Sequence, residues 1–336
     1  MHYGRFHHHD AQGISIVKKI ILLVWAFLLI ACSATQEQPA PAPPVPSEEQ
    51  ISTQSVPGDQ QFGAFSQPRN NGPAVVADLN AKWNQTSRNC FNSETAPSFL
   101  CSGVVIRGTT NGPGFNIWDP SPANVKKGFV AFSYMRQDSR FPALYSHANN
   151  GYIVTPVSEL AGQLKFQYLC FFPIDGATEW RSDYGCGPHS LHGNRSASCA
   201  SQAITTSTKF LTHYLAGATV REQKQCSFDV RDTSPDQTAV LFREALLVMP
   251  KIPKNGVNDE NELVVRVWAK QAAANMPIKA FFYTSGSTPG WTQARQNQSA
   301  YYSQSGGKVV PVVMLTINKS TWAASFTYSG SDQIYP

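Results

Sequence analysis

Short runs of β-branched and aromatic residues recur along most of this 336-residue chain, separated by polar stretches rich in Gly, Pro, Asn and Ser. Runs of this kind are typical of buried strands bounded by turns. The predicted strands are residues 103–107, 129–135, 152–156, 166–173, 226–230, 263–268, 280–283, 309–317 and 323–328. Helical spacing or a helix-capping residue predicts helices at residues 74–83, 205–214, 234–249 and 291–302.

The order of these elements indicates the fold class. Strands outnumber helices, and no regular strand–helix alternation repeats, so the sequence predicts an α+β fold. We expect a mixed, mainly antiparallel sheet core with a few helices, stapled by disulfides. The sequence contains no P-loop and no dinucleotide-binding glycine fingerprint.

The N-terminal region has the organisation of an export signal. Lys18 and Lys19 precede an apolar run at residues 20–30, which is short for a membrane-spanning helix. The sequence Leu29-Ile30-Ala31-Cys32 resembles the lipobox of bacterial lipoproteins. The resemblance implies that Cys32 is lipidated, and that Ser33 after it favours the outer membrane. Ordinary secretion, with Cys32 inside a cleaved peptide, is the alternative.

Three regions of different composition follow from this pattern. Residues 1–32 are predicted to be a lipoprotein signal peptide, with an N-terminal extension that does not suit one, and we expect translation to start at Val17. Residues 33–71, rich in Pro, Gln and Ser, are predicted to be a disordered tether. Residues 72–336 are predicted to form one globular domain that faces the periplasm or cell surface, or is secreted.

The charge pattern argues against nucleic acid as a partner. The net charge is +5, the basic residues are scattered, and no basic stripe is present.

The cysteine count points to an oxidising compartment. Of the seven cysteines, six remain after Cys32, and an even number behind an export signal favours disulfides. Six cysteines allow fifteen pairings, and we expect Cys90–Cys101, Cys186–Cys199 and Cys170–Cys226. A zinc site at Cys186-x-x-His189-x-x-His192 with Cys199 is the alternative.

Arg107 is the first candidate for binding chemistry. It ends the apolar strand 103–107, where a guanidinium must be paired or must await an anionic ligand. Gly108 leaves the backbone bare, so that a ligand can come close. The alternative is an arginine at a strand end, paired to a carboxylate or reaching solvent along its aliphatic stem.

Three segments carry a recognisable order of motifs. They are Val105-Ile106-Arg107-Gly108, Gly128-Phe129-Val130-Ala131-Phe132-Ser133 and Glu260-Asn261-Glu262-Leu263-Val264-Val265. In this order they resemble the Arg, Ser and Glu-x-Glu motifs of the ADP-ribosyltransferase fold, a family that includes bacterial toxins and NAD glycohydrolases. The family's usual Ser-Thr-Ser is Ala-Phe-Ser here, and Thr205-Thr206-Ser207 is an alternative position for it.

The resemblance implies a role for each residue. Arg107 would hold a phosphate of NAD with its two-pronged guanidinium, and Ser133 would brace the pocket of the nicotinamide ribose. Glu262 would bond the ribose 2′-hydroxyl and stabilise the oxocarbenium-like state that forms as nicotinamide leaves. Glu260 would orient an acceptor in a transferase.

The exported domain as a whole, from about residue 77 to 328, resembles the halovibrin group of secreted Gram-negative proteins. The motifs that carry this resemblance are Cys101-Ser-Gly-Val-Val-Ile-Arg-Gly, Trp118-Asp-Pro-Ser-Pro, Phe171-Phe-Pro-Ile-Asp-Gly-Ala, Cys226-Ser-Phe-Asp-Val and Asn261-Glu-Leu. The group is described as NAD glycohydrolases or ADP-ribosyltransferases. The resemblance therefore implies NAD as substrate, a protein as a possible acceptor, and no metal.

Two alternatives belong to other classes. A hydrolase site would use the acidic residues and histidine of the loop after residue 173, which are Asp175, Glu179, Asp183 and His189. A non-enzymatic surface lipoprotein would present loop aromatics to a glycan or a partner, namely Trp118, Trp180, Tyr184 and Trp291.

Overall fold

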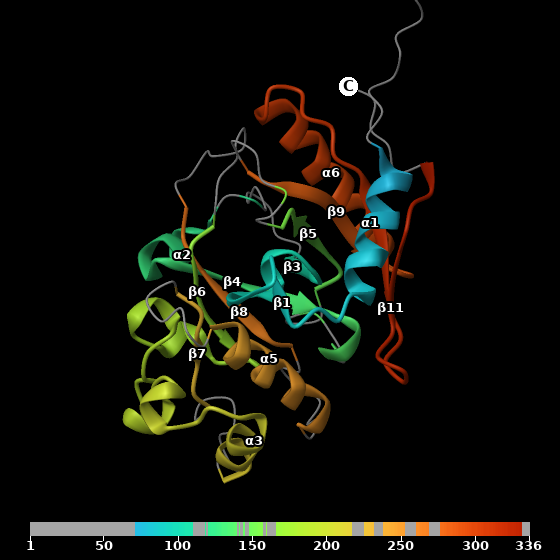
Figure 1. Ribbon diagram of the computed structural model, residues 1–336. Coiled ribbons are helices and arrows are strands. Elements are labelled where there is room, and N and C mark those ends of the chain that lie inside the picture. The colour runs from blue at the N-terminus through green and yellow to red at the C-terminus, as the bar shows by residue number, and fades with distance from the viewer. Residues whose placement is uncertain are drawn as a thin grey trace, which may run out of the picture. The chain divides into compact units, whose positions relative to one another are not determined.

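A nine-stranded sheet, in the order β11-β10-β9-β5-β3-β4-β8-β6-β7, forms the centre of the described chain (Figure 1). Neighbouring strands are antiparallel except β9 and β10, which are parallel. The strands are β3 (Val104–Thr109), β4 (Phe129–Met135), β5 (Asn150–Val154), β6 (Tyr168–Phe172), β7 (Phe228–Asp229), β8 (Glu262–Arg266), β9 (Ile278–Thr284), β10 (Val312–Ile317) and β11 (Ala324–Thr327). The predicted α+β class with a mainly antiparallel core is confirmed.

The computed structural model describes residues 71–109, 118, 120–139, 141, 144, 148–156, 159, 166–216, 225–231, 238–252, 260–268 and 276–330. All of them belong to one compact unit, Ala64–Pro336. The predicted signal peptide, the lipidation site Cys32 and the tether up to residue 70 lie outside the described residues. Within the described ranges, no helix combines the length and apolar character needed to cross a bilayer.

Helices cover both faces of the sheet. They are α1 (Gly72–Asn84), α2 (Pro122–Lys127), α3 (Ser207–Ala216), α5 (Thr238–Val248) and α6 (Thr288–Gln304). Helix α1 lies beside β11 (Figure 1) and packs Leu79 and Trp83 into the hydrophobic cluster that also holds Ile106. Helices α5 and α6 pack into the larger cluster on the other face, which contains Val105. Alternate residues of β3 thus face different cores.

Local capping explains where several helices begin. Ser121 Oγ accepts the Asn124 N–H at 3.1 Å and starts α2, a short helix that the sequence pattern did not predict. Thr206 Oγ1 accepts the Lys209 N–H at 3.2 Å at the predicted start of α3. Ser287 Oγ accepts the Gly290 N–H at 3.1 Å, so α6 begins before the expected residue 291.

A small hairpin was also not predicted. Its strands are β1 (Asn89–Cys90) and β2 (Ser93–Pro97). Strand β2 contains little apolar surface of its own, and its position depends on contacts with α5 and on the Cys90–Cys101 disulfide. Such an element is defined by its tertiary contacts and leaves no periodic signal.

Three disulfides staple the domain, which is typical of proteins that fold in an oxidising compartment. The predicted Cys90–Cys101 bond is present. The other two predicted pairs are wrong, because Cys170 bonds Cys186 and Cys199 bonds Cys226.

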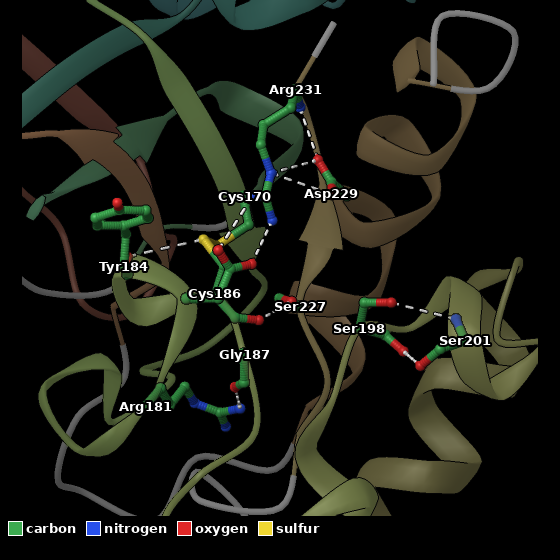
Figure 2. A network of polar contacts seen from close by, with 11 residues as sticks. Cys170, Arg181, Tyr184, Cys186, Gly187, Ser198, Ser201, Ser227, Asp229 and Arg231 are labelled. Atoms are coloured by element: carbon green, nitrogen blue, oxygen red, sulfur yellow. Dashed lines mark hydrogen bonds and ion pairs between the residues drawn. A yellow bond between two sulfur atoms is a disulfide. The ribbon is translucent and has the colours of Figure 1, made fainter. Parts of the chain in front are cut away.

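The structure gives the reason for this difference. The loop after β6 folds back over the sheet, so that Cys186 joins Cys170 in a small hydrophobic cluster. Figure 2 shows this disulfide and the Ser227 hydroxyl, which donates to the Cys186 carbonyl oxygen at 2.7 Å. A parallel bridge between Ser198 and Ser227 then sets the adjacent Cys199 beside Cys226. Both cysteines of the alternative zinc site are therefore disulfide-bonded, and that alternative is wrong.

Candidate active site

A cavity of about 390 Å³ lies along one face of β4. This face carries Phe129, Ala131, Ser133 and Met135 in alternation. Phe129 and Met135 belong to two separate hydrophobic clusters, one toward each end of the strand. Ala131 and Ser133 between them are small, so the space between the two clusters is left open.

The strand pairing along β4 is incomplete on both edges beside this cavity. Strand β3 pairs with β4 only through residues 104–106, whereas β8 pairs with the other half of β4 through residues 263–266. Each neighbour therefore covers only part of β4, and backbone groups on the uncovered parts need other partners.

Two side chains supply those partners. The Arg107 Nη1 donates to the Ala131 carbonyl oxygen across the gap that opens after Ile106. On the other edge of β4, the Asn261 Oδ1 accepts the Tyr134 N–H at 2.7 Å and its Nδ2 donates to the Tyr134 carbonyl oxygen at 2.8 Å. The Asn261 amide thus replaces the strand pairing that β8 would have made had it begun earlier.

All of the residues that the sequence motifs singled out line this one cavity. They are Arg107, Ser133, Glu260 and Glu262. Ser133 pairs with Ile106 of β3, and one further step of the β4–β8 register places it opposite Glu262. The alternative serine motif at residues 205–207 does not contribute to the lining, since Thr206 caps α3 instead.

Glu262 is the most strongly perturbed of these groups. Its side chain is buried, with one carboxyl oxygen accepting the Gly176 N–H at 2.9 Å and the other accepting from Thr178 Oγ1 at 3.2 Å. Burial raises the pKa of Glu262 well above its usual value, and the charges of Asp175 and Glu260 raise it further. The Gly176 and Thr178 hydrogen bonds oppose this rise without cancelling it.

The turn after β6 forms another wall of the cavity. Asp175, Ala177, Thr178, Glu179 and Trp180 all contribute to the lining. Asp175 is buried, and its Oδ1 accepts the Ala177 N–H at 2.8 Å. Two of the four residues proposed for a separate hydrolase site, Asp175 and Glu179, therefore share the cavity with the residues of the Arg–Ser–Glu motifs.

The remaining members of that hydrolase cluster lie elsewhere. Asp183 pairs with Arg231 at 2.7 Å and does not line the cavity. His189 is buried within the loop, where its backbone N–H donates to Ser196 Oγ and its ring Nδ1 accepts the backbone N–H of Leu191. The alternative hydrolase site therefore has only Asp175 and Glu179 in this cavity, since neither Asp183 nor His189 lines it.

One part of the cavity rim carries charge and an aromatic ring. Lys127 of α2 and Glu179 form an ion pair at 3.8 Å. The Trp180 Nε1 donates to Glu179 Oε1 at 2.9 Å, and Trp180 is 59% exposed. Trp118, by contrast, is fully buried, so it does not serve as a surface platform.

The lining brings basic and acidic groups together in one cavity. Its basic groups are Arg107 and Lys127, and its four carboxyl groups are those of Asp175, Glu179, Glu260 and Glu262. A buried carboxyl with a raised pKa suits proton transfer or the stabilisation of a developing cation. No group of His, Cys, Asp and Glu side chains among the described residues is arranged to hold a metal ion.

Several residues of the cavity had no clear signal in the sequence. Asn261 belongs to the Glu-x-Glu and Asn261-Glu-Leu motifs, but neither motif assigns it a role, because that role depends on where β8 begins. Lys127 enters the lining because Ser121 and Pro122 start α2, and this Ser-Pro signal could have predicted that helix. Searches against protein-family models and curated proteins give no match for this sequence.

Proposed function

We propose that this protein cleaves the bond between nicotinamide and ribose in NAD, as an NAD glycohydrolase or ADP-ribosyltransferase. One observation carries the proposal. Arg107, Ser133, Glu260 and Glu262, which come from three different parts of the sequence, line a single cavity of about 390 Å³. This volume is typical of a small-molecule site, and the motif order is the one that resembles the ADP-ribosyltransferase fold.

The charges of the cavity match those of the proposed substrate. NAD carries a cationic nicotinamide ring and an anionic pyrophosphate. In the proposed complex, Arg107 donates to a phosphate oxygen and the carboxyl cluster surrounds the ribose and the nicotinamide ring. Binding of the cationic ring favours the ionised form of Glu262, because opposite charges lower a carboxyl pKa.

The reaction then depends on charge that develops as the bond breaks. Nicotinamide leaves as a neutral amide with the bonding electron pair, and positive charge forms on the ribose carbon and ring oxygen. The ionised Glu262 stabilises this oxocarbenium-like state, with Ser133 beside it on β4. Water or a protein nucleophile then adds to the ribose carbon and releases its proton to solvent, and Glu260 orients this acceptor.

The cellular setting follows from the N-terminal sequence. The proposal is an outer-membrane lipoprotein anchored through Cys32, or a secreted form, of the halovibrin-like type. Three disulfides agree with either location, since both are oxidising.

The direct test is release of nicotinamide from NAD by the purified, oxidised domain. We expect release at neutral pH without added metal, measured by chromatography of the products. Intact NAD after incubation across a range of pH, metal and acceptor conditions would contradict the proposal and favour the surface binding protein.

Replacing Arg107 is expected to weaken substrate binding. The phosphate charge is present before and during the reaction, so Arg107→Ala should raise KM by about 10- to 100-fold, corresponding to one or two charge-assisted hydrogen bonds. Arg107→Lys should restore binding only partly, because lysine lacks the two-pronged guanidinium. Arg88→Ala, at an exposed arginine outside the cavity, is the control. Equal KM values in all of these proteins would exclude Arg107 from the substrate site.

The pH dependence should follow the raised pKa of Glu262. The ionised form is the active one, so kcat/KM should rise with pH through that pKa, well above the usual carboxyl range. Stability should change in the opposite sense. A carboxyl whose pKa is raised by folding contributes stability below its unfolded pKa, and this contribution is lost as pH rises through the folded pKa. An acid limb near pH 4 would contradict the assignment of Glu262.

A further inference from the structure

Arg181 is a buried cation that donates hydrogen bonds to four main-chain carbonyl oxygens. It is 7% exposed and directly follows η6 (Thr178–Trp180). Its Nε donates to the Gly176 carbonyl oxygen, its Nη1 to those of Gly187 and Ser196, and its Nη2 to that of Gln225 at 2.9 Å. Figure 2 shows the contact between Arg181 and Gly187.

A second side chain holds the same turn. The Gln225 Nε2 donates to the Ile174 carbonyl oxygen at 2.8 Å and to that of Asp175. Arg181 and Gln225 together therefore bind three consecutive carbonyl groups, at Ile174, Asp175 and Gly176. The Gly176 N–H on this turn donates to Glu262 at 2.9 Å, and Thr178 two residues later donates to the other oxygen.

The guanidinium also contributes charge. It lies over the Phe172 ring at 4.7 Å, and Phe172 pairs with Glu262 between β6 and β8. Burial lowers the pKa of Arg181 to about 10, and the charges of Glu262 and Asp175 oppose this fall. Arg181 is therefore protonated at neutral pH, and by reciprocity its charge favours the ionised form of both carboxyl groups.

Burying a guanidinium is costly unless its donors are satisfied. The neutral Gln225 amide holds two carbonyl oxygens of the same turn, so mechanical support of the turn does not by itself require a charged donor. The retained charge instead lies behind the turn that contacts Glu262. Asp175 from this turn and Glu260 just before β8 are the charges that raise the pKa of Glu262. Arg107 of β3, Lys127 of α2 and Glu179 line the same cavity.

We propose that Arg181 is a positioning residue for the active carboxyl, which fixes the turn at Gly176 so that Gly176 and Thr178 hold Glu262, and supplies the positive charge that balances the surrounding carboxyl groups. Arg181 touches no substrate in this proposal. The inference rests on the proposed function for its catalytic meaning, but its structural part is testable without turnover.

The test compares Arg181→Met, which removes the charge, with Arg181→Lys, which keeps it. Arg231→Met is the matched control, because the Arg231 side chain bonds Asp183 of the same loop and Asp229 (Figure 2), rather than the carbonyl groups of the Gly176 turn. The measurements are the pH profile of kcat/KM for nicotinamide release and the titration of the Glu262 carboxyl by NMR. Amide exchange at Gly176 in the wild-type protein is the third measurement.

We expect Arg181→Met to reduce kcat/KM by about 10²-fold, the effect of a small misplacement of a catalytic group. In this variant, the acid limb of the kcat/KM profile and the titration of Glu262 should both move to higher pH. In Arg181→Lys and Arg231→Met, the titration of Glu262 should stay at its wild-type position. A Glu262 titration that is unchanged in Arg181→Met, or that moves equally in Arg231→Met, would overturn the proposal.

Two further outcomes separate the hypotheses. If the wild-type protein leaves NAD intact but the Glu262 titration moves in Arg181→Met, the proposed function fails and the positioning role stands. If Arg181→Met does not fold, fast exchange of the Gly176 amide in the wild-type protein overturns the role, and slow exchange together with a wild-type titration in Arg181→Lys supports it.

Discussion

Replacing Glu262 with glutamine is expected to reduce kcat for nicotinamide release by about 10²–10³, with a smaller rise in KM from the lost attraction for the cationic nicotinamide ring. A preorganised electrostatic contact to charge that develops only in the transition state has an effect of this size. The substrate carries no such charge on its ribose before the bond breaks, so the loss falls mainly on kcat. Steady-state kinetics with NAD measures both constants.

The substitution should leave the structure intact. Glutamine retains one oxygen to accept the Gly176 N–H, and its amide can donate to the Thr178 hydroxyl, which accepts as well as donates. Glutamine also removes a buried ionisable group whose pKa is raised, so the variant should become more stable relative to wild type as pH rises.

Two further substitutions serve as controls for this experiment, one outside the cavity and one in its lining. Glu94→Gln changes an exposed carboxyl outside the cavity and should have wild-type kinetics. Asp175→Asn removes the main charge that raises the pKa of Glu262, so its acid limb should move to lower pH. Full activity in Glu262→Gln combined with loss of activity in Asp175→Asn would mean that the cavity is correct and the assigned carboxyl is wrong.

Replacing Asn261 with alanine is expected to lower the free energy of unfolding by about 2–4 kcal/mol. Asn261 is fully buried, and its amide satisfies both the N–H and the carbonyl oxygen of Tyr134. Leaving a buried backbone group without a partner costs about 1–3 kcal/mol, and two groups are affected here. Denaturant unfolding of the oxidised protein measures the change.

Asn80 offers a matched comparison. Its amide makes the same pair of contacts from α1 to Phe326 of the edge strand β11, with both distances 2.9 Å. Asn80 is only half-buried, so water can replace it, and Asn80→Ala should cost less than Asn261→Ala. An equal or larger loss at Asn80 would contradict the idea that Asn261 compensates for a break inside the sheet.

The sequence predicted the elements that depend on local pattern. Strand β4 has the predicted limits, Phe129–Met135, because an apolar β-branched and aromatic run between Gly128 and Arg136 leaves no competing structure. Helices α1 and α3 follow from spacing and from the Thr206 cap. Residues 232–237, with the predicted cap at Ser234, lie outside the described part of the chain, and α5 is described only from Thr238.

The pairing of cysteines illustrates the limit of such reasoning. Nearest neighbours in the sequence predicted a Cys186–Cys199 bond, which would be correct for an isolated loop. The loop instead packs onto β6, where Cys186 meets Cys170 in an apolar cluster, and this contact spans residues that no local pattern connects. The parallel bridge at Ser198 and Ser227 is likewise a long-range feature.

By itself, the sequence singled out the residues of the proposed site. An arginine at the end of an apolar strand needs a partner or a ligand, and the two glutamates stood out only through the resemblance of the motif order to the ADP-ribosyltransferase fold. Only the tertiary structure brought Arg107, Ser133 and Glu262 around one cavity and added Asp175 to it. Strand order, the incomplete pairing along β4 and the raised pKa of Glu262 all depend on contacts between distant segments, whose energies are not encoded in any single stretch of chain.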